Sequence, residues 1–286
     1  MSHKSGDRQQ VTVRPLQTRQ DCQACVSLQR EIWGADFVDV VSATVLMVSQ
    51  RVGGVAAGAF DTTHRLIGFV SGISGVTDGT LAHWSAMLAV RPEARRGGLG
   101  RRLKFYQRAR LLEQGIQVAS WSYDPLIAHN ASFNLNVLGA CPTEYVVDMY
   151  GETGSTLHRG LDTDRLIVTW RLEDPGVAGR VAGKQRVSLP DTVAETPVVI
   201  PPHGMVSDAS HRSLPTSDWL RIAVPADISS LKATNPEEAH RWQLSVREAF
   251  RSCLENGYRV VGFCDGNEAE PPAYVLTTQP VSGPDR

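Results

Sequence analysis

Apolar residues follow two kinds of spacing along residues 11–172. Short runs that are continuously apolar, or that alternate with polar residues, predict β-strands, and apolar stripes spaced by three and four residues predict helices. The expected strands lie at 11–16, 55–60, 66–72, 81–90, 118–123, 141–150 and 165–172, and the expected helices at 18–33, 42–48, 99–115 and 130–138. This order, β-α-α-β-β-β-α-β-α-β-β, predicts an α/β fold, in which a mixed sheet carries helices on both faces.

The periodicity fades after residue 172 and returns near residue 218. The intervening stretch is rich in Pro, Gly, Ser and Thr, which predicts a connector. Asn235 followed by Pro236 then marks a helix start, with Asn as the cap and Pro in the first turn. Flanked by strands at 219–224, 258–264 and 273–277, this helix gives a β-α-β-β extension. Such an extension is too small to be an enzyme alone, so we expect it to dock on the preceding domain or on a partner subunit.

These patterns divide the chain into five parts. They are a disordered N-terminus at 1–10, a main α/β domain at 11–172, a connector at 173–217, a small α/β extension at 218–278 and a tail at 279–286.

Composition narrows the class of protein. A length of 286 residues with 42 % hydrophobic residues suffices for one large core or two modest ones. A net charge of −1 gives no electrostatic reason to expect a nucleic-acid partner. No apolar run approaches the ~20 residues that span a bilayer, and the polar N-terminus lacks the apolar segment of a secretory signal. We therefore expect a cytoplasmic protein without a membrane partner.

Cys22 and Cys25 form a C-x-x-C motif in the first expected helix. Thr18 and Asp21 have the spacing of a capping box, which places the start of this helix just before the motif. No second cysteine pair and no histidine pair stands at ligand spacing, so the sequence does not indicate a metal site. Both thiols fall on the apolar face of the helix, and we interpret them as part of the core.

The stretch from Arg91 to Gly100 carries the chemistry of a binding loop. It lies between an expected strand and a basic amphipathic helix. The glycines at 97, 98 and 100 let backbone N–H groups approach a ligand closely, and the start of the helix adds free donors and the positive end of its dipole. Arg95 and Arg96 add formal charge, and Arg101 and Lys104 are expected to reach a further phosphate. The loop therefore predicts a pyrophosphate site.

Arg95-x-x-Gly98-x-Gly100 resembles the pyrophosphate loop of the GNAT superfamily of acyl-CoA-dependent N-acyltransferases. The order of elements over residues 11–172 resembles that fold as well. Further runs resemble one bacterial group of predicted acetyltransferases with relatives among amino-acid N-succinyltransferases. They are Arg102-Leu103-Lys104 with Gln107-Arg108, Trp121–Leu126, Asn130–Asn134, Leu138-Gly139-Ala140, Thr163–Leu166, Pro225-Ala226-Asp227 and Trp242…Arg247–Phe250.

The resemblance implies that acetyl-CoA or another acyl-CoA is the co-substrate. It implies that the strand at 88–90 offers backbone groups to the acyl carbonyl and the pantetheine arm, that the amides of 96–100 hold the pyrophosphate, and that Asn130 touches the pantetheine. The expected cofactor-binding residues are Leu88, Ala89, Val90, Arg95, Arg96, Gly97, Gly98, Leu99, Gly100, Arg101 and Asn130.

The sequence identifies the proton-transfer residues less clearly than the binding loop. The reaction must orient a neutral amine against a thioester, accept a proton and stabilise an oxyanion. Our candidates are His83 on the fourth strand and Asp124 and Tyr145 near strand ends, although each also has a structural explanation: a strand cap, a turn before Pro125, and a core aromatic. Many GNAT enzymes carry a tyrosine where this chain has Leu135.

Relatives in the bacterial group also tend to carry His-Ser-His on the fourth strand, where this chain has Trp84-Ser85-Ala86. Two functions therefore stay open. One is an enzyme that transfers an acetyl or succinyl group to the amine of a small molecule. The other is a catalytically degenerate domain that binds or senses acyl-CoA. A homodimer is compatible with either function.

Charged residues give one sequence indication of the acceptor class. No acidic run stands out that would attract a lysine-rich peptide. Arg91, Arg159 and Arg165 are instead candidates to bind a carboxylate in bidentate fashion. Together with the resemblance, they favour a free amino acid as the acceptor.

Overall fold

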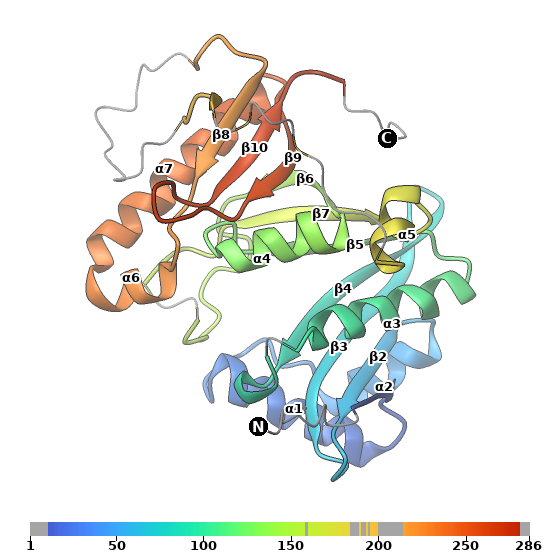
Figure 1. Cartoon of the computed structure of the whole chain (residues 1–286). Coiled ribbons are helices and arrows are strands. Elements are labelled where there is room, and N and C mark those ends of the chain that lie inside the picture. Colours follow the sequence, from blue (N-terminus) through green and yellow to red (C-terminus); the bar gives the residue numbers. More distant parts are fainter. Residues whose placement is uncertain are drawn as a thin grey trace, which may run out of the picture. The chain divides into compact units, whose positions relative to one another are not determined.

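The computed structural model describes residues 11–95, 97–157, 160–183, 189, 193, 195–199 and 214–280, and it divides into compact units at 1–119 and 120–286 (Figure 1). The limit between them falls inside β5 (Val118–Tyr123) rather than at the connector. Strands and helices alternate along the chain as expected, so the fold is of the mixed α/β class. The domain limits expected at 172 and 217 stay predictions.

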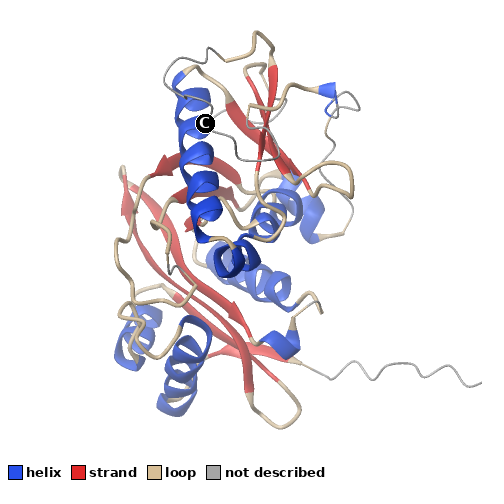
Figure 2. Cartoon of the chain, turned by 90° about the vertical axis from the view of Figure 1, so that its left-hand side faces the viewer, coloured by secondary structure: helices blue, strands red, loops and turns tan. Residues whose placement is uncertain are grey.

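The first unit is built on an antiparallel arrangement of consecutive strands. β1 (Thr12–Pro15) pairs with β2 (Val55–Phe60), β2 with β3 (Leu66–Thr77), and β3 with β4 (Thr80–Val90). The helices α1 (Arg19–Trp33) and α2 (Ala43–Arg51) lie on one face, and α3 (Leu99–Glu113) lies on the other (Figure 2).

The start of α1 confirms the capping box that the sequence predicts at Thr18 and Asp21. The Thr18 hydroxyl accepts a hydrogen bond from the Asp21 amide at 3.0 Å, and the Asp21 carboxylate accepts one from the Thr18 amide at 3.2 Å. Cys22 and Cys25 are fully buried in the core that α1 and α2 form with Phe69 of β3. The described residues hold no group of three or more His, Cys, Asp or Glu that could bind a metal ion.

β3 and β4 are longer than expected, because they continue as a hairpin to Thr77 and Thr80. The turn between them consists of Asp78 and Gly79, which both have positive φ, 51° and 74°. Asp-Gly is a strong signal for a two-residue hairpin turn of this kind. The expectation that the strand ends at 72 passed over this signal.

A β-bulge interrupts the pairing of β3 with β4. Ser71 lies opposite Met87 and Ile73 opposite Trp84, so Ser85 and Ala86 together face the single residue Gly72. The extra residue reverses the order in which side chains alternate along β4. Met87 therefore packs in the core beneath α1 and α2, whereas Ser85 lies on the face that α3 covers.

The second unit combines the end of the main domain with the extension. β6 (Cys141–Val146) pairs antiparallel with β7 (Arg165–Arg171), and β10 (Ala273–Thr277) lies between β8 (Trp219–Ala223) and β9 (Arg259–Cys264). α4 (Ala128–Ser132) continues directly into a π-helical turn, η2 (Phe133–Leu138). The extension contributes α6 (Ile228–Thr234) and α7 (Pro236–Glu255), whose cap Asn235 was expected.

The segment expected to be a connector contains a helix, α5 (Pro175–Val181). The Asp174 carboxylate caps it by accepting a hydrogen bond from the Val177 amide at 3.0 Å, and Pro175 stands at the first helical position. Asp-Pro before a short apolar stretch is itself a helix start signal, which the overall composition obscured. The N-terminus expected at 1–10 lies outside the described residues, as do residues 281–286 of the tail expected at 279–286.

Within the second unit, the extension docks on the end of the main domain. The Asn136 amide donates a hydrogen bond to the Phe263 carbonyl at 2.9 Å, and the Tyr274 hydroxyl donates one to the Pro125 carbonyl at 2.9 Å. The ring of Phe250 on α7 stacks on Tyr145 at a centroid distance of 5.2 Å. Aromatic and directional contacts thus join residues far apart in sequence into one core.

Candidate functional site

The loop between β4 and α3 presents an open helix N-terminus. Gly98 caps α3 with a φ of 71°, and the first bond of the helix runs from the Arg102 amide to the Gly98 carbonyl at 3.1 Å. Among the described residues no side chain caps this end, and the first turn contains no acidic residue. The amides at 99–101 are therefore available as donors for an anion. An added Cβ at Gly98 meets no atom within 4 Å, so the described residues leave space beside this cap.

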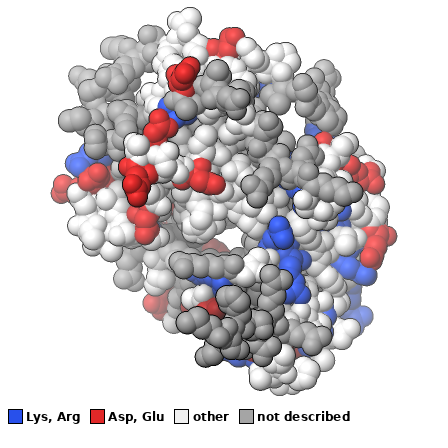
Figure 3. Space-filling model, in the orientation of Figure 1, with Lys and Arg blue, Asp and Glu red and all other residues white. Residues whose placement is uncertain are grey.

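Basic side chains lie close to this end in sequence. The Arg95 guanidinium donates to the Val90 carbonyl at 3.1 Å, which ties it to the end of β4 while it stays exposed. Arg101 is exposed on the first turn of α3, and basic side chains gather on the surface where α3 lies (Figure 3). Arg96 lies outside the described residues. Positive charge and free amides together suit a pyrophosphate.

The position of Lys104 differs from the one expected from the sequence. We expected it on the exposed face, within reach of a phosphate, but its side chain is only 2 % exposed. Its ammonium nitrogen donates to the Ser85 hydroxyl at 2.9 Å and to the Gln107 carbonyl oxygen at 3.0 Å. The buried face of α3 follows the spacing 99, 103, 107, 111, and Lys104 lies beside it.

His83 belongs to the same buried group, which we call the β4–α3 polar cluster: Ser74, His83, Ser85, Lys104 and Gln107. His83 is 2 % exposed. Its Nδ1 lies 2.9 Å from the Ser74 hydroxyl and its Nε2 lies 3.0 Å from the Gln107 amide nitrogen. The Gln107 carbonyl oxygen also accepts from the Ser85 hydroxyl at 3.0 Å. The cluster is a continuous chain of hydrogen bonds between β3, β4 and α3.

The partners of His83 determine its tautomer. Ser74 donates its hydroxyl proton to the Gly53 carbonyl at 2.7 Å, so its oxygen accepts from Nδ1–H of His83. Nε2 is then the acceptor for the Gln107 amide. Burial lowers the pKa of His83 to about 4, and the nearby Lys104 acts in the same direction. Burial likewise lowers the pKa of Lys104 well below its ordinary value. His83 is therefore neutral at pH 7 and has both nitrogens engaged.

The strand residues expected to meet the acyl group lie just before the loop. Leu88, Ala89 and Val90 pair regularly with Val70, Phe69 and Gly68 of β3. Ala89 is buried in the core beneath α1 and α2. The bulge thus lies directly upstream of the expected acyl site, and the loop that is expected to bind pyrophosphate lies directly downstream.

Asp124 and Tyr145 lie in the second unit, apart in the chain from His83 and the loop. One carboxylate oxygen of Asp124 accepts from the Leu126 amide at 2.8 Å, which is the turn before Pro125 that the sequence suggested. Its other oxygen accepts no hydrogen bond from a described residue. Burial raises the pKa of Asp124, and the Arg165 guanidinium opposes the rise. Asp124 is half-buried.

Tyr145 donates its hydroxyl proton to the Asp164 carboxylate at 2.7 Å. Asp164 in turn accepts from Arg247 of α7 at 2.8 Å through each oxygen. Arg247 also pairs with Asp162 at 2.7 Å, whose backbone exchanges hydrogen bonds with Gln243. We call Tyr145, Asp162, Asp164, Gln243 and Arg247 the Arg247 cluster. The sequence reading missed its role, although Asp164 and Arg247 both lie in motifs that carry the resemblance.

The remaining candidates are placed as follows. Asn130 is half-buried in α4. Arg165 is 5 % exposed and donates to the Asp164 carbonyl at 2.8 Å, with its guanidinium 5.3 Å from the Tyr150 ring centroid. Arg91 is engaged by Glu31 and by the Leu66 carbonyl, so it is a poor carboxylate ligand. Arg159 lies outside the described residues.

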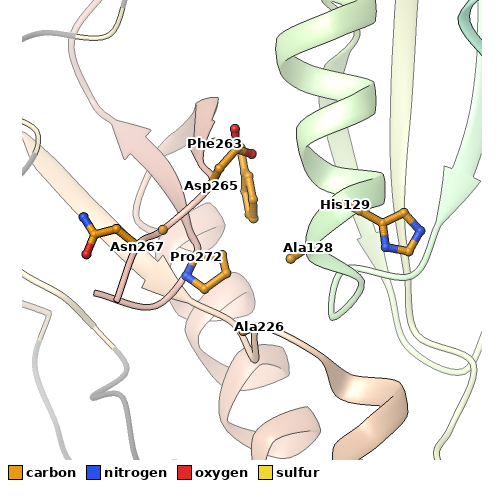
Figure 4. Close-up of a pocket in the computed structure, with 8 residues that line it drawn as sticks. Ala128, His129, Ala226, Phe263, Asp265, Asn267 and Pro272 are labelled. Carbon is orange, nitrogen blue, oxygen red and sulfur yellow. The ribbon is translucent and has the colours of Figure 1, made fainter. Parts of the chain in front are cut away.

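A cavity of about 370 Å³ opens in the second unit between α4 and the extension (Figure 4). Its walls are mainly apolar, with Ala128 facing Phe263 and Pro272, while the imidazole of His129 points away from them. Asp265 supplies a carboxylate at its edge. None of the candidate residues lines it.

No family model matches the chain. The chain is 30 % identical over 183 residues to a mycothiol acetyltransferase of Kytococcus sedentarius, a match that covers 64 % of this chain and 49 % of the relative. The match thus spans about half the length of that relative. None of the helices in the described residues is long and apolar enough to cross a membrane.

Solved structures of acetyltransferases show a weaker likeness. The NatC complex bound to Gag peptide and CoA aligns with a TM-score of 0.45 at 14 % identity, covering 57 % of this chain and 98 % of that chain. The ribosomal-protein-S18-alanine N-acetyltransferase of Escherichia coli gives 0.44 at 17 %, covering 57 % and 94 %. A Salmonella typhimurium protein solved with its cofactor acetyl-CoA gives 0.44 at 17 %, covering 64 % and 98 %. TM-scores at this level do not assign the fold by themselves.

Proposed function

We propose that this chain is an acyl-CoA-dependent N-acyltransferase of the GNAT superfamily, which transfers an acyl group to the amine of a small molecule. The observation that carries the proposal is the uncapped N-terminus of α3, which follows Gly98 in the left-handed conformation and a bulged β4. The loop motif around Gly98 and the similarity to a mycothiol acetyltransferase support it.

The described residues fit acyl-CoA at this loop. The amides at 99–101 would hold the pyrophosphate, because no described side chain caps them and they stand at the positive end of α3. Arg95 and Arg101, both exposed, would add charge. Bound there, the thioester supplies an activated acyl group. In this proposal the backbone at 88–90 orients the acyl arm.

The transfer forms a C–N bond, breaks the C–S bond and moves a proton from the attacking amine. Asp124 is the group we assign to accept that proton, since one of its oxygens makes no bond to a described residue and burial raises its pKa. Tyr145 is less suited, because its hydroxyl proton is already donated to Asp164. His83 is less suited for a different reason: it is buried, with both nitrogens engaged.

A thermal shift experiment tests the loop. Acetyl-CoA at about one hundred times its Kd should stabilise the parent by about 2.7 kcal/mol. Gly98→Val should abolish this stabilisation, because a β-branched side chain disfavours the φ of 71° and crowds the free amides. Gly115→Val is the matched control, since Gly115 follows the other end of α3 with a φ of 75° and also has no neighbour within 4 Å. Equal ligand stabilisation in both variants would remove the loop from the site.

For the acceptor we propose a free amino acid or a similar amino-carboxylate, with an acetyl or succinyl group as the one transferred. The buried guanidinium of Arg165 supports this, because a carboxylate would be a bidentate partner for it. Both enantiomers of phenylalanine should be compared with phenethylamine under one acyl-CoA. Loss of the carboxylate should lower kcat/KM by a factor of 10⁴ or so, roughly the penalty for a missing polar partner in a built site. Equal turnover of the amine would exclude this acceptor class.

A second function is favoured by the state of two candidates: both nitrogens of His83 are engaged, and Tyr145 already donates its proton to Asp164. The chain would then bind acyl-CoA without turning it over. Release of free CoA thiol separates the two functions. Binding without release in the presence of an amino-acid panel would favour the sensing module.

A further inference from the structure

The β4–α3 polar cluster lies at the centre of the contact between α3 and the sheet. Along this face of α3, Leu99, Leu103 and Leu111 are buried, and Gln107 takes the remaining place in the same spacing. Lys104 and Gln107 face β4, where they bind Ser85 at the bulge. Gln107 also reaches His83 two residues further along β4. One side chain of α3 is thus held at two points of the strand.

Apolar contacts and hydrogen bonds constrain a helix differently. Leucine side chains tolerate small sliding and rotation of a helix, because dispersion contacts have little direction. Hydrogen bonds of 2.9–3.0 Å, as in this cluster, weaken steeply with distance and angle. A shift of α3 along β4 would break the bonds of Gln107 to both His83 and Ser85. The cluster therefore fixes both the rotation and the axial position of α3.

The cost of removing these polar groups from water also indicates that the cluster serves to fix the position of α3. Apolar residues of similar volume would pack there with equal or greater stability, because buried polar groups must first lose their water. The bulge at Ser85 and Ala86 and the glycine at 72 both serve the arrangement, since an added Cβ at Gly72 would overlap the His83 ring. What the cluster contributes is a defined geometry.

We propose that Lys104 and Gln107 are positioning residues that hold the N-terminus of α3 in register with β4, so that acyl-CoA meets both the amides at 98–101 and the strand at 88–90. Lys104 lies in the second turn of α3, and Ser85 lies just before residues 88–90. A rigid helix transmits the position of Lys104 to Gly98. The inference rests on the proposed function, because it assigns acyl-CoA to this loop.

Lys104→Met tests the inference, because it keeps the length and packing of the side chain and removes the donors. The expected result is a rise of about tenfold in the Kd for acetyl-CoA, equivalent to about 1.4 kcal/mol. The KM for acetyl-CoA should rise in parallel, while kcat at saturation should stay within about twofold. Amide hydrogen exchange at 98–102 should become faster.

Leu111→Ala is the control for a merely structural effect, since Leu111 is fully buried on the same face of α3 but belongs to no polar contact. It should lower the unfolding midpoint and leave the Kd within about twofold. The double variant Lys104→Met/Gln107→Leu also leaves His83 Nε2 and the Ser85 hydroxyl without their partners on α3, so its unfolding midpoint should lie below that of Lys104→Met. Its Kd should stay raised.

The possible outcomes distinguish a positioning role of the cluster from a purely structural one. If Kd follows the unfolding midpoint in all variants, including Leu111→Ala, the cluster is structural and the inference is wrong. A parental Kd in the double variant overturns it as well. If the parent binds acetyl-CoA and Lys104→Met binds it equally well, only this inference fails. A parent that does not bind acetyl-CoA at all overturns the proposed function together with it.

Discussion

The β4–α3 polar cluster of the first unit and the Arg247 cluster of the second both bury polar side chains, but they treat charge in opposite ways. In the first, burial lowers the pKa of His83 and of Lys104, so desolvation works against the charged forms. In the second, the hydrogen bonds that Arg247 donates to the Asp164 and Asp162 carboxylates raise the pKa of Arg247. Burial thus disfavours positive charge in the β4–α3 polar cluster, whereas the Arg247 cluster pairs its positive charge with carboxylates.

This difference has consequences for function. The hydrogen bonds of the β4–α3 polar cluster depend strongly on direction, which suits the positioning of a helix. A cluster of ion pairs is held by charge, and it ties α7 of the extension to residues 162–164. The first should respond to pH, and the second to the loss of a single charged partner. The predictions below test these responses in order of expected size.

Arg247→Met should have the largest effect, a loss of about 3–5 kcal/mol in the free energy of unfolding. The variant keeps the apolar stem and leaves the Asp164 carboxylate, which is 2 % exposed, without its guanidinium. Chemical denaturation measures the loss. The control is Arg251→Met, one turn further along α7 and exposed, which should stay within about 0.5 kcal/mol. If both variants lose equally little, the charges of the Arg247 cluster are not compensating one another.

Replacing Asp164 in the same background sharpens the comparison. Asp164→Asn combined with Arg247→Met removes the stranded charge, so part of the stability should return. A double variant less stable than Arg247→Met would mean that the carboxylate is satisfied by its other donors, Tyr145 and the Asp148 amide.

The pH dependence of stability should reveal His83. Its pKa in the folded protein is about 4, below the value of 6.5 for a free histidine. Between these values the unfolded state binds more protons, so stability falls as pH drops from 6.5 to 4 and is fully retained above 6.5. The difference amounts to roughly 3 kcal/mol for a buried group.

His83→Gln should abolish this part of the acid destabilisation, although it lowers stability at pH 7. His240→Gln, at an exposed position of α7, serves as the control and should keep the parental slope. Urea midpoints between pH 4 and pH 7 give the comparison. A parental slope in His83→Gln would show that the imidazole is not the group that titrates.

The sequence predicted local features of the fold well, because their causes are local. Thr18 and Asp21 form the expected capping box, and Asn235 caps α7 as expected. Each depends on residues within one turn of a helix. The cysteines at 22 and 25 are buried as expected, because the spacing of apolar residues in α1 defines its inner face.

The faces of α3 and the side-chain directions in β4 were not predicted, because they depend on distant partners. Basic residues at 101, 104 and 108 share a helical stripe, which suggested that Lys104 is exposed. The spacing 99, 103, 107, 111 was the competing signal, and it would have placed Gln107 at the centre of the buried face. No residue pattern in the sequence predicts the bulge at Ser85. Without the bulge, the alternation along β4 would place His83 on the same face of the sheet as Met87, which α1 and α2 cover.

The candidate site was predicted in part for the same reason. The glycines and the helix start of the loop are local, so the start of α3 directly after Gly98 was predicted, whereas the role of Gly98 as its cap is seen only in the structure. Proton-transfer groups need tertiary contacts to be judged. Only the structure shows that Tyr145 donates to Asp164 and that His83 has both nitrogens engaged. Their assignment as catalytic residues stays a prediction.

Tyr145→Phe should have the smallest effect of the series and decides whether the Arg247 cluster takes part in chemistry. The substitution removes one hydroxyl and keeps the ring that stacks on Phe250 at 5.2 Å. Asp164 retains both bonds to Arg247, so the loss in unfolding free energy should be about 1 kcal/mol, that of one hydrogen bond. If the hydroxyl is only a structural donor, kcat for acyl transfer should stay within about twofold. A proton-transfer role would instead lower kcat by about 10²-fold or more while the stability changed equally little. Because burial and the Asp164 carboxylate both raise the pKa of Tyr145, its hydroxyl stays protonated throughout the assay range, and no basic limb of the pH profile should move in the variant.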